Sequence, residues 1–292
     1  MSLPSKGLMV MGLAVLCLSA RTEASWFGDL ALSLSHDDNL NRAALYQDER
    51  TDAFLDAELA WLRPFDLRTH GVLDAGVGLS ARLHDRFDDL NFVALDVGLN
   101  YHRRFGLGPQ ALWLGGHVEY QYLSVNDEWR EGNRQSLGLN IGRGWGDTWQ
   151  ASVGVAYSRQ SPDNLDQAGG NAPYNVFRLS EYTLNVDVEY ALNNGWLLLG
   201  GIDYMDGQIN SSTTDPDLFE GDPPPWVDDP VFGPDFRTYR LDATALGYSL
   251  GVSIPIGHRA SFNVLGRFTS VNADDDISYG ATRWQFSYLR EL

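Results

Sequence analysis

The sequence has 292 residues, 43% of them hydrophobic, and carries 39 Asp and Glu against 21 Lys and Arg, a formal net charge of −18. This acidic excess argues against a nucleic-acid partner, because the phosphates would be repelled. The single cysteine, Cys17, lies near the N-terminus. A disulfide framework, a thiolate metal site and a cysteine nucleophile are therefore excluded for the rest of the chain.

Residues 1–24 have the pattern of a secretory signal peptide. A short basic start ends at Lys6, an apolar run covers residues 7–20, and residues 22–24, TEA, form a small-residue cleavage site. The apolar run is shorter than the ~20 residues that a membrane-spanning helix needs. We predict cleavage after Ala24, leaving residues 25–292 as one domain.

After the cleavage site, apolar residues alternate with small or polar ones over stretches of roughly ten residues, the period and length of a tilted membrane strand. In chain order the predicted strands contain residues 30–34, 55–61, 73–84, 93–101, 112–122, 137–141, 149–157, 182–190, 196–204, 246–254, 262–268 and 284–288. The ninth is ambiguous because Leu197, Leu198 and Leu199 break the alternation. We place Leu198 outward, since this phase keeps both Trp196 and Tyr204 on the outside.

The connections alternate strictly between short and long. Short turns are predicted at residues 64–66, 105–109, 144–147, 193–195 and 257–258, and long loops at 36–50, 85–89, 124–133, 159–177, 206–236 and 270–282. Short turns at one end and longer loops at the other are typical of a transmembrane barrel, and an even strand number places both termini at the turn end.

Aromatic residues gather near both ends of the predicted strands. Near the turns are Trp61, Tyr101, Trp149, Tyr190 and Trp196, and near the loops are Tyr120, Tyr122, Tyr157, Tyr182, Tyr204 and Trp284. Two such groups match the aromatic girdles with which a barrel meets the two faces of a bilayer.

With these features, residues 25–292 resemble Gram-negative outer-membrane β-barrel proteins of the porin-like kind. The final segment WQFSYLREL is similar to the assembly signal of that class, although it ends in Leu292 rather than Phe and Arg290 interrupts its apolar phase. The resemblance implies an all-β fold: a single antiparallel transmembrane β-barrel of about twelve strands, with short periplasmic turns and long extracellular loops. It further implies contact with outer-membrane lipid and lipopolysaccharide, and recognition of the C-terminal strand by the barrel-assembly machinery.

The strand phase also predicts which side chains line the lumen. The charged and titratable candidates are Asp56, Glu58, Asp74, Arg82, Asp96, His117, Glu119, Asp187, Glu189, Asp203 and Arg267. An acidic lining would concentrate cations and exclude anions, whereas ion pairs among the same groups would plug the barrel, and the sequence leaves both open. The tenth strand has a small inward face, so water, a small solute or an infolded loop must fill the adjacent volume; this face consists of Ala243, Ala245, Gly247, Ser249, Gly251 and Ser253.

The longest predicted loop, residues 206–236, is a candidate constriction. Its acidic and aromatic residues are Asp215, Asp217, Glu220, Asp222, Trp226, Asp228 and Asp229. Three prolines at residues 223–225 stiffen its middle. The alternative is a solvated acidic surface loop.

No catalytic motif, zinc spacing or phosphate-binding loop is present, so we expect neither an enzyme nor a metal or cofactor site. The best hydrolase candidate is His36 beside Asp37 and Asp38. The leading interpretation is a narrow porin for passive diffusion of small neutral or cationic solutes. The alternative is a non-conducting surface barrel that displays acidic loops for interaction, export or adhesion.

Overall fold

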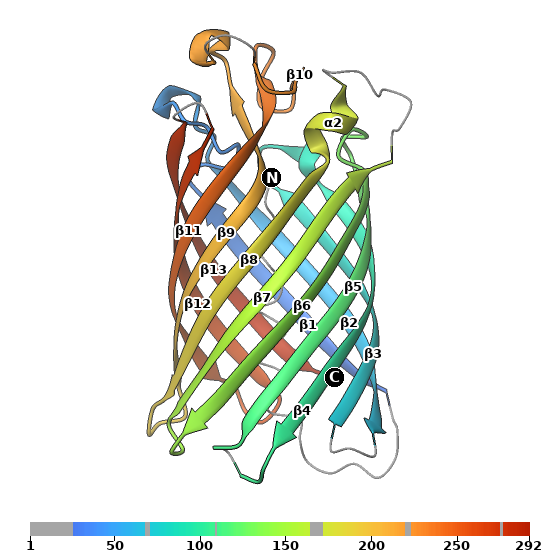
Figure 1. The fold of residues 1–292 in the computed structure, drawn as a ribbon, viewed down its shortest axis with the longest axis vertical. Coiled ribbons are helices and arrows are strands. Elements are labelled where there is room, and N and C mark those ends of the chain that lie inside the picture. The colour runs from blue at the N-terminus through green and yellow to red at the C-terminus, as the bar shows by residue number, and fades with distance from the viewer. Residues whose placement is uncertain (1–25, 68–70, 109, 164–171, 220–222, 275–276) are drawn as a thin grey trace.

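The structure, a computed structural model, describes residues 26–67, 71–108, 110–163, 172–219, 223–274 and 277–292. Twelve antiparallel strands form a closed, tilted barrel (Figure 1). The barrel strands are β1 (Phe27–Asp37), β2 (Asp52–Leu67), β3 (Gly71–His84), β4 (Phe92–Phe105), β5 (Leu112–Val125), β6 (Gly132–Trp145), β7 (Trp149–Pro162), β8 (Leu179–Ala191), β9 (Leu197–Thr213), β11 (Arg237–Pro255), β12 (Ala260–Ala273) and β13 (Ser278–Glu291). The predicted all-β fold and strand number are confirmed; the predicted signal peptide lies outside the described residues.

Each barrel strand pairs with its neighbours in the chain, and β13 closes the barrel by pairing with β1. The register of this closing seam extends from Asp29 opposite Glu291 to Asp37 opposite Arg283. The longest register joins β9 to β11, from Leu197 opposite Ser253 to Thr213 opposite Arg237. Closure satisfies the backbone hydrogen bonds of both edge strands, which an open sheet inside a lipid bilayer could not do.

The outer surface of the barrel is a belt of exposed aliphatic and aromatic side chains. On β4, for example, Val93, Leu95, Val97 and Leu99 are each about half exposed. The ambiguous ninth strand follows the predicted phase, because Leu198, Ile202 and Tyr204 are all exposed. Aromatic rings also pack together within each predicted girdle. At the turn end, the ring centroids of Trp149 and Tyr190 lie 4.5 Å apart, and at the loop end those of Tyr157 and Tyr182 lie 4.9 Å apart.

The predicted strict alternation of short turns and long loops holds only in part, because several strands are longer than predicted: the loop between Ala273 and Ser278 is shorter than the turn between Phe105 and Leu112. Residues 64–66 were predicted to be a turn and instead belong to β2, which extends to Leu67. The predicted loop 206–236 is shorter, because β9 extends to Thr213 and β11 begins at Arg237. The predicted loop 270–282 likewise shrinks to the few residues between Ala273 and Ser278.

The loop end carries additional short elements above the barrel. They are α2 (Pro173–Phe177), β10 (Trp226–Asp228), and the 3-10 helices η1 (Tyr46–Asp48), η2 (Asp88–Leu90) and η4 (Pro216–Leu218). Strand β10 pairs with β11, so part of loop 214–236 continues the sheet beyond the barrel rim. Within the part of the chain that the structure describes, no helix has the length and apolar character needed to cross a membrane.

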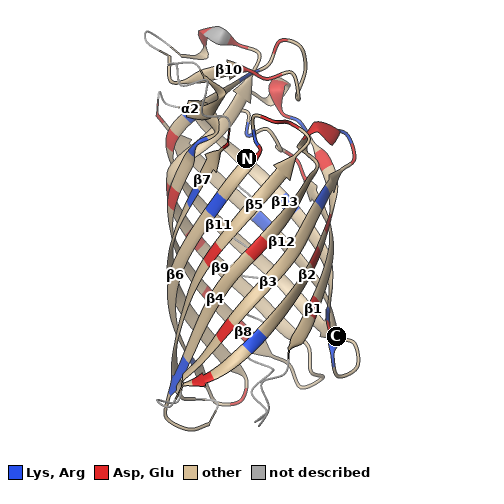
Figure 2. Ribbon diagram, turned by 90° about the vertical axis from the view of Figure 1, so that its right-hand side faces the viewer, with Lys and Arg blue, Asp and Glu red and all other residues tan. Residues whose placement is uncertain are grey.

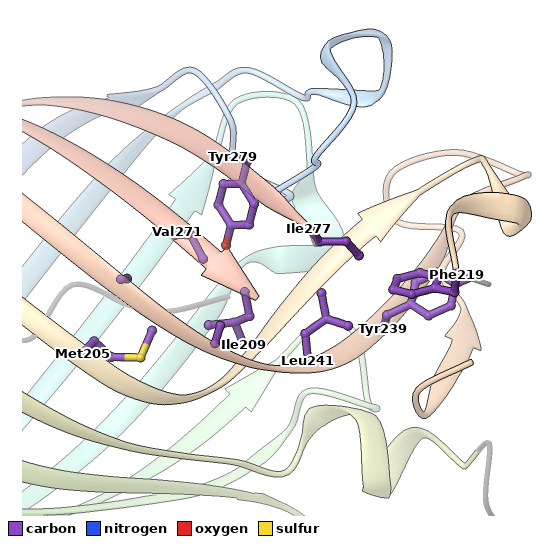
Figure 3. Close-up of a cluster of buried hydrophobic side chains, with 10 residues drawn as sticks. Met205, Ile209, Phe219, Tyr239, Leu241, Val271, Ile277 and Tyr279 are labelled. Carbon is purple, nitrogen blue, oxygen red and sulfur yellow. The ribbon is translucent and has the colours of Figure 1, made fainter. Parts of the chain in front are cut away.

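The largest buried apolar cluster lies at the loop end, on the inner face of the barrel (Figure 3). We call it the mouth cluster; it consists of Met205, Ile209, Phe219, Tyr239, Leu241, Ala243, Ala245, Val271, Ile277 and Tyr279. Phe219 lies against Tyr239, with ring centroids 4.2 Å apart. Ala44, from the loop between β1 and β2, packs against the cluster. Apolar side chains therefore pack against one another on one side of the lumen at the loop end.

Candidate functional site

The interior wall is built by the residues that alternate with the apolar belt. Charged residues recur along the barrel strands (Figure 2). On β2 and β3 these inward positions include Asp56, Glu58, Asp74 and Arg82, as the strand phase predicted. Successive side chains of a strand point to opposite faces of the sheet. Because the apolar residues face outward, the polar residues that alternate with them face the lumen.

On one side of the lumen, an ion pair crosses the small inward face of β11. Arg267 of β12 donates from Nη2 to Oδ2 of Asp203 on β9, at 2.6 Å. A Cβ at Gly247 would lie 2.6 Å from both carboxylate oxygens of Asp203, so the absence of a side chain there makes room for the pair. The volume beside β11, which the sequence assigned to water, a solute or a loop, is here occupied by this ion pair and, nearer the mouth, by the mouth cluster.

A second ion pair lies on β2 and β3. Arg82 binds both oxygens of Asp56, with Nε–Oδ1 and Nη2–Oδ2 distances of 2.7 and 3.1 Å. The Arg82 guanidinium also lies 4.2 Å from the ring centroid of Phe54. Ser80 and Gln121 both donate to the carboxylate of Asp96, so this predicted lining residue is hydrogen-bonded from two other strands. Two predicted carboxylates are thus neutralised by the two predicted arginines, and a third is held by neutral donors.

The remaining predicted lining residues lie farther toward the turn end of the same walls. The Asp187 carboxylate accepts a hydrogen bond from Asn185. His117 covers Gly138 of β6, where an added Cβ would collide with the imidazole ring. Within the described part of the chain, Asp74, Asp187 and Glu189 form no ion pair with an arginine. Glu58 and Glu119 complete the set and each has an interaction partner.

At the loop end, the connection between β1 and β2, residues 38–51, folds inward and binds the opposite wall. The backbone N–H of Ser212 on β9 donates to the carbonyl oxygen of Asn41 at 3.0 Å, and Asn41 Nδ2 donates back to the Ser212 carbonyl oxygen at 3.2 Å. Ser211 donates from its hydroxyl to the carbonyl oxygen of Arg42 at 2.7 Å. This loop therefore crosses the mouth and is held by β9. The sequence pattern indicated only the longest loop as a constriction, and this shorter one was missed.

Asp48 anchors the far side of the same loop. Its carboxylate accepts three hydrogen bonds, from the Thr213 hydroxyl at 2.5 Å and from the hydroxyl and backbone N–H of Thr214 at 2.7 and 2.9 Å. Burial alone would raise the pKa of Asp48, but these hydrogen bonds outweigh it and hold the pKa below its ordinary value. The ionised form of Asp48 therefore fastens loop 38–51 to the end of β9.

The described parts of loop 214–236, residues 214–219 and 223–236, lie over the mouth and contact the loops on the other side. Phe232 packs against Phe87 with ring centroids 5.4 Å apart, and both belong to a buried cluster with Leu40 of loop 38–51. Arg50 contacts the Phe236 ring, with its guanidinium carbon 4.4 Å from the centroid. This loop was predicted as a candidate constriction, and its described part packs on the outer side of loop 38–51. We call it the cover.

The acidic residues of loop 214–236 have different environments. Asp229 is fully buried and binds Arg130 of the β5–β6 loop at 2.5 Å, and it also accepts a hydrogen bond from the Thr238 hydroxyl. Asp228 is exposed, 3.4 Å from Arg237. Asp215 accepts a hydrogen bond from the Asp217 backbone N–H at 3.0 Å and so caps η4.

Trp226 is half-buried against the mouth cluster, with its ring 4.4 Å from the Arg237 guanidinium carbon. Glu220 and Asp222 lie outside the described residues. One predicted carboxylate therefore locks the cover in place, while the others described lie on its surface.

Sequence reasoning missed the arginines that hold the outer end together. Arg42 and Arg283 both bind Asp37, at 2.9 and 2.6 Å. Arg130, in the segment EWRE, binds Asp229. Nothing in the strand pattern marks these residues: Arg42 lies in a loop close to Asp37, and the partners of Arg283 and Arg130 lie far away in the sequence. The buried His84–Asp52 contact, at 2.7 Å, is of the same kind.

The side chains of the hydrolase candidate, His36 and Asp37, do not come together. His36 lies on the outward face of β1, in phase with the exposed Leu32 and Leu34, whereas Asp37 faces inward and is engaged by two arginines. The two side chains therefore point to opposite sides of the sheet. Among the described residues, no group of three or more His, Cys, Asp or Glu side chains has the arrangement of a metal site.

Comparisons with known proteins identify the fold. No protein-family profile matches the chain, and no curated protein sequence matches it. An outer membrane channel from Pseudomonas putida F1 has a similar structure, with a TM-score of 0.59 and 12% identity over 94% of this chain and 98% of that one.

Two less similar structures are the KdgM porin in complex with disordered oligogalacturonate and the outer membrane phospholipase A from Escherichia coli. The first has a TM-score of 0.46 with 8% identity over 90% of this chain and 98% of that one. The second has a TM-score of 0.44 with 14% identity over 90% of this chain and 95% of that one. The closed barrel with its apolar belt, together with the likeness to the Pseudomonas channel, shows that the chain has the porin-like β-barrel fold of bacterial outer-membrane channels.

Proposed function

We propose that this protein is an outer-membrane channel for passive diffusion of small solutes, and that its acidic interior favours neutral and cationic ones. The observation that carries the proposal is the charge of the inner wall. Asp56 and Asp203 are balanced by Arg82 and Arg267, whereas Asp74, Asp187 and Glu189 form no ion pair with an arginine among the described residues. Their charge would attract cations into the lumen and repel anions.

The loop layer at the outer end supports a narrow rather than an open channel. Loop 38–51 is bonded across the mouth to β9, and loop 214–236 is packed on top of it. A solute entering from outside must pass this layer or displace it. We therefore propose low conductance in the resting protein, with brief larger openings whenever the cover moves, since loop motions occur on nanosecond to microsecond and slower scales.

The test is conductance of the purified barrel in a planar lipid bilayer under a KCl gradient. The wild-type reversal potential is expected to show a preference for K⁺ over Cl⁻. The triple variant Asp74→Asn, Asp187→Asn, Glu189→Gln is expected to move that potential toward zero. The matched control is Asp206→Asn, Asp242→Asn, which removes exposed charges from the outer surface of β9 and β11 and should leave it unchanged. Equal permeability to both ions in the wild type would refute the acidic-lumen proposal.

The second candidate function is a non-conducting barrel that displays its loops to a partner. The continuous apolar and ionic packing of the loop layer favours it, because this layer has its own buried core. Replacing residues 214–236 with a short Gly-Ser linker separates the two functions. A channel should gain conductance when its cover is removed. A display barrel should remain non-conducting.

A further inference from the structure

Four outward-facing arginines lie at the turn end of the barrel, the periplasmic side of an outer-membrane protein. They are Arg63 of β2, Arg103 of β4, Arg143 of β6 and Arg290 of β13, and we call them the arginine belt. Each shares the outward phase of the lipid-facing side chains on its strand: Arg63 follows Trp61, and Arg143 follows Ile141. Figure 2 shows basic positions at this end of several strands.

The belt is flanked by aromatic side chains that meet the membrane interface. Arg63 lies over the ring of Phe65, with its guanidinium carbon 5.3 Å from the centroid, and Arg103 lies over Phe105 at 4.8 Å. Trp145, two residues after Arg143, is about half exposed. Aromatic residues of this kind mark the headgroup level of a bilayer, so the guanidinium groups lie at the depth of the lipid phosphates. An arginine in the middle of the lipid-facing surface would instead be strongly unfavourable.

The arginines of the belt are not neutralised by the part of the chain that the structure describes. None of the four forms an ion pair with a described carboxylate. The Nε atoms of Arg63 and Arg103 are shielded from water and meet no acceptor among the described residues. A buried donor without an acceptor is unfavourable. An anionic oxygen from outside the chain would supply both the missing charge and the missing acceptor.

The belt covers one side of the barrel only. Its strands, β13, β2, β4 and β6, lie along one continuous arc that includes β1, β3 and β5. On the remaining strands, β7, β8, β9, β11 and β12, the outward residues nearest the turns are apolar or aromatic, such as Tyr190 and Ile254. At the opposite, loop end, the outward charges are mixed, because Asp206 and Asp242 are acidic and Arg159 of β7 is basic. The clustering of outward arginines is therefore confined to one arc of the periplasmic rim.

We propose that the arginine belt is a binding surface for the phosphate groups of anionic phospholipids in the periplasmic leaflet. Guanidinium groups suit this ligand because their planar donors match phosphate oxygens in pairs. Each basic residue near a membrane surface strengthens binding to anionic lipid by roughly fivefold. The bound lipids would form a partial ring along the arc from β13 to β6 and would fix the depth and tilt of the barrel.

The experiment is native mass spectrometry of the full mature barrel after transfer from mixed phosphatidylethanolamine and phosphatidylglycerol vesicles. The wild type is expected to retain phosphatidylglycerol in preference to phosphatidylethanolamine. The fourfold variant, with Gln at positions 63, 103, 143 and 290, is expected to lose this preference. The matched control is Arg159→Gln, which removes an outward arginine of β7 near the loop end and should keep it. Equal retention of phosphatidylglycerol by the wild type and the fourfold variant would overturn the proposal.

A competition with inorganic phosphate separates a lipid site from a site for the free anion. Excess phosphate should displace little lipid if the belt needs a bilayer headgroup; full displacement would mean a site for free phosphate and would overturn the proposal. Folding is checked by heat-modifiable gel mobility. If the fourfold variant does not fold, the pair Arg143→Gln and Arg290→Gln, both at exposed positions, is used in its place, with a loss of roughly 25-fold expected from two arginines. Conductance should be unchanged in either variant, since none of these side chains faces the lumen.

Discussion

Replacing Arg130 with Met should loosen the cover over the channel mouth without unfolding the barrel. Asp229 is fully buried, and Arg130 is its only ion-pair partner among the described residues. Burial alone would lower the pKa of Arg130, but the neighbouring Asp229 and Asp127 carboxylates raise it, so Arg130 keeps its charge. Removing one member of a buried pair strands the other charge and destabilises by about 3–5 kcal/mol. The closed state of loop 214–236 should therefore lose about two to four orders of magnitude in population relative to open states.

Hydrogen exchange of the amides in residues 226–236, read by mass spectrometry, measures that opening directly. The double variant Arg130→Met, Asp229→Leu should recover most of the protection, since an apolar pair leaves no stranded charge. Arg237→Met is the matched control, because Arg237 at the start of β11 pairs with Asp228 of the same loop at 3.4 Å, Asp228 is largely exposed, and such pairs contribute about 0–1 kcal/mol. Unchanged exchange in Arg130→Met, or a double variant as unprotected as the single one, would mean that the buried pair does not hold the cover.

Three further changes test other parts of the structure. The hydrogen bonds of Asp48 lower its folded-state pKa, so its stabilisation is complete above the ordinary value of 3.8 and is lost as the pH falls through the lowered value; wild-type conductance should rise only in that acidic range, and Asp48→Asn should remove the step. Arg267→Gln leaves Asp203 without its ion pair and should increase the preference for K⁺ in reversal-potential measurements, whereas a shift toward Cl⁻ would contradict the assigned orientation. Gly132→Ala should weaken the β6–β7 pairing by about 1–3 kcal/mol in urea unfolding, because the added Cβ would overlap the carbonyl oxygen of Ser161. The control is Gly146→Ala, whose Cβ would meet no neighbour, so any loss of stability in that variant would come from the positive φ of Gly146 alone.

The strand number and phase could be predicted because lipid imposes a strict period of two on every strand it touches. Beyond the lipid-facing part of a strand, this alternation is no longer required. At the end of β9, Asn210, Ser211, Ser212 and Thr213 are all polar and look like a loop, yet they pair with β11 as a regular ladder. The turn predicted at residues 64–66 was also wrong, because a proline near the end of β2 resembles a turn signal.

The candidate site was only partly predictable for a related reason. Alternation indicates that Asp203 and Arg267 both face inward, but not that they meet over Gly247. That contact depends on the register of three strands. The hydrogen bonds that Asp48 accepts from Thr213 and Thr214 join segments far apart in the sequence. Neither segment has a local pattern that predicts contact with the other. Pairings of this kind follow from the closed geometry of the barrel.

The seam between β1 and β13 has a consequence for the order in which the barrel can form. Its two strands are the first and last barrel strands that the structure describes, and their pairing has the greatest sequence separation among the described strand pairs. Until β13 is in place, the free edge of β1 exposes unpaired N–H and C=O groups that invite pairing with other chains. Every other hairpin can form between neighbours, but the ring cannot close early. A chain that lacks only its final strand would therefore be an open sheet with two reactive edges, not a smaller barrel.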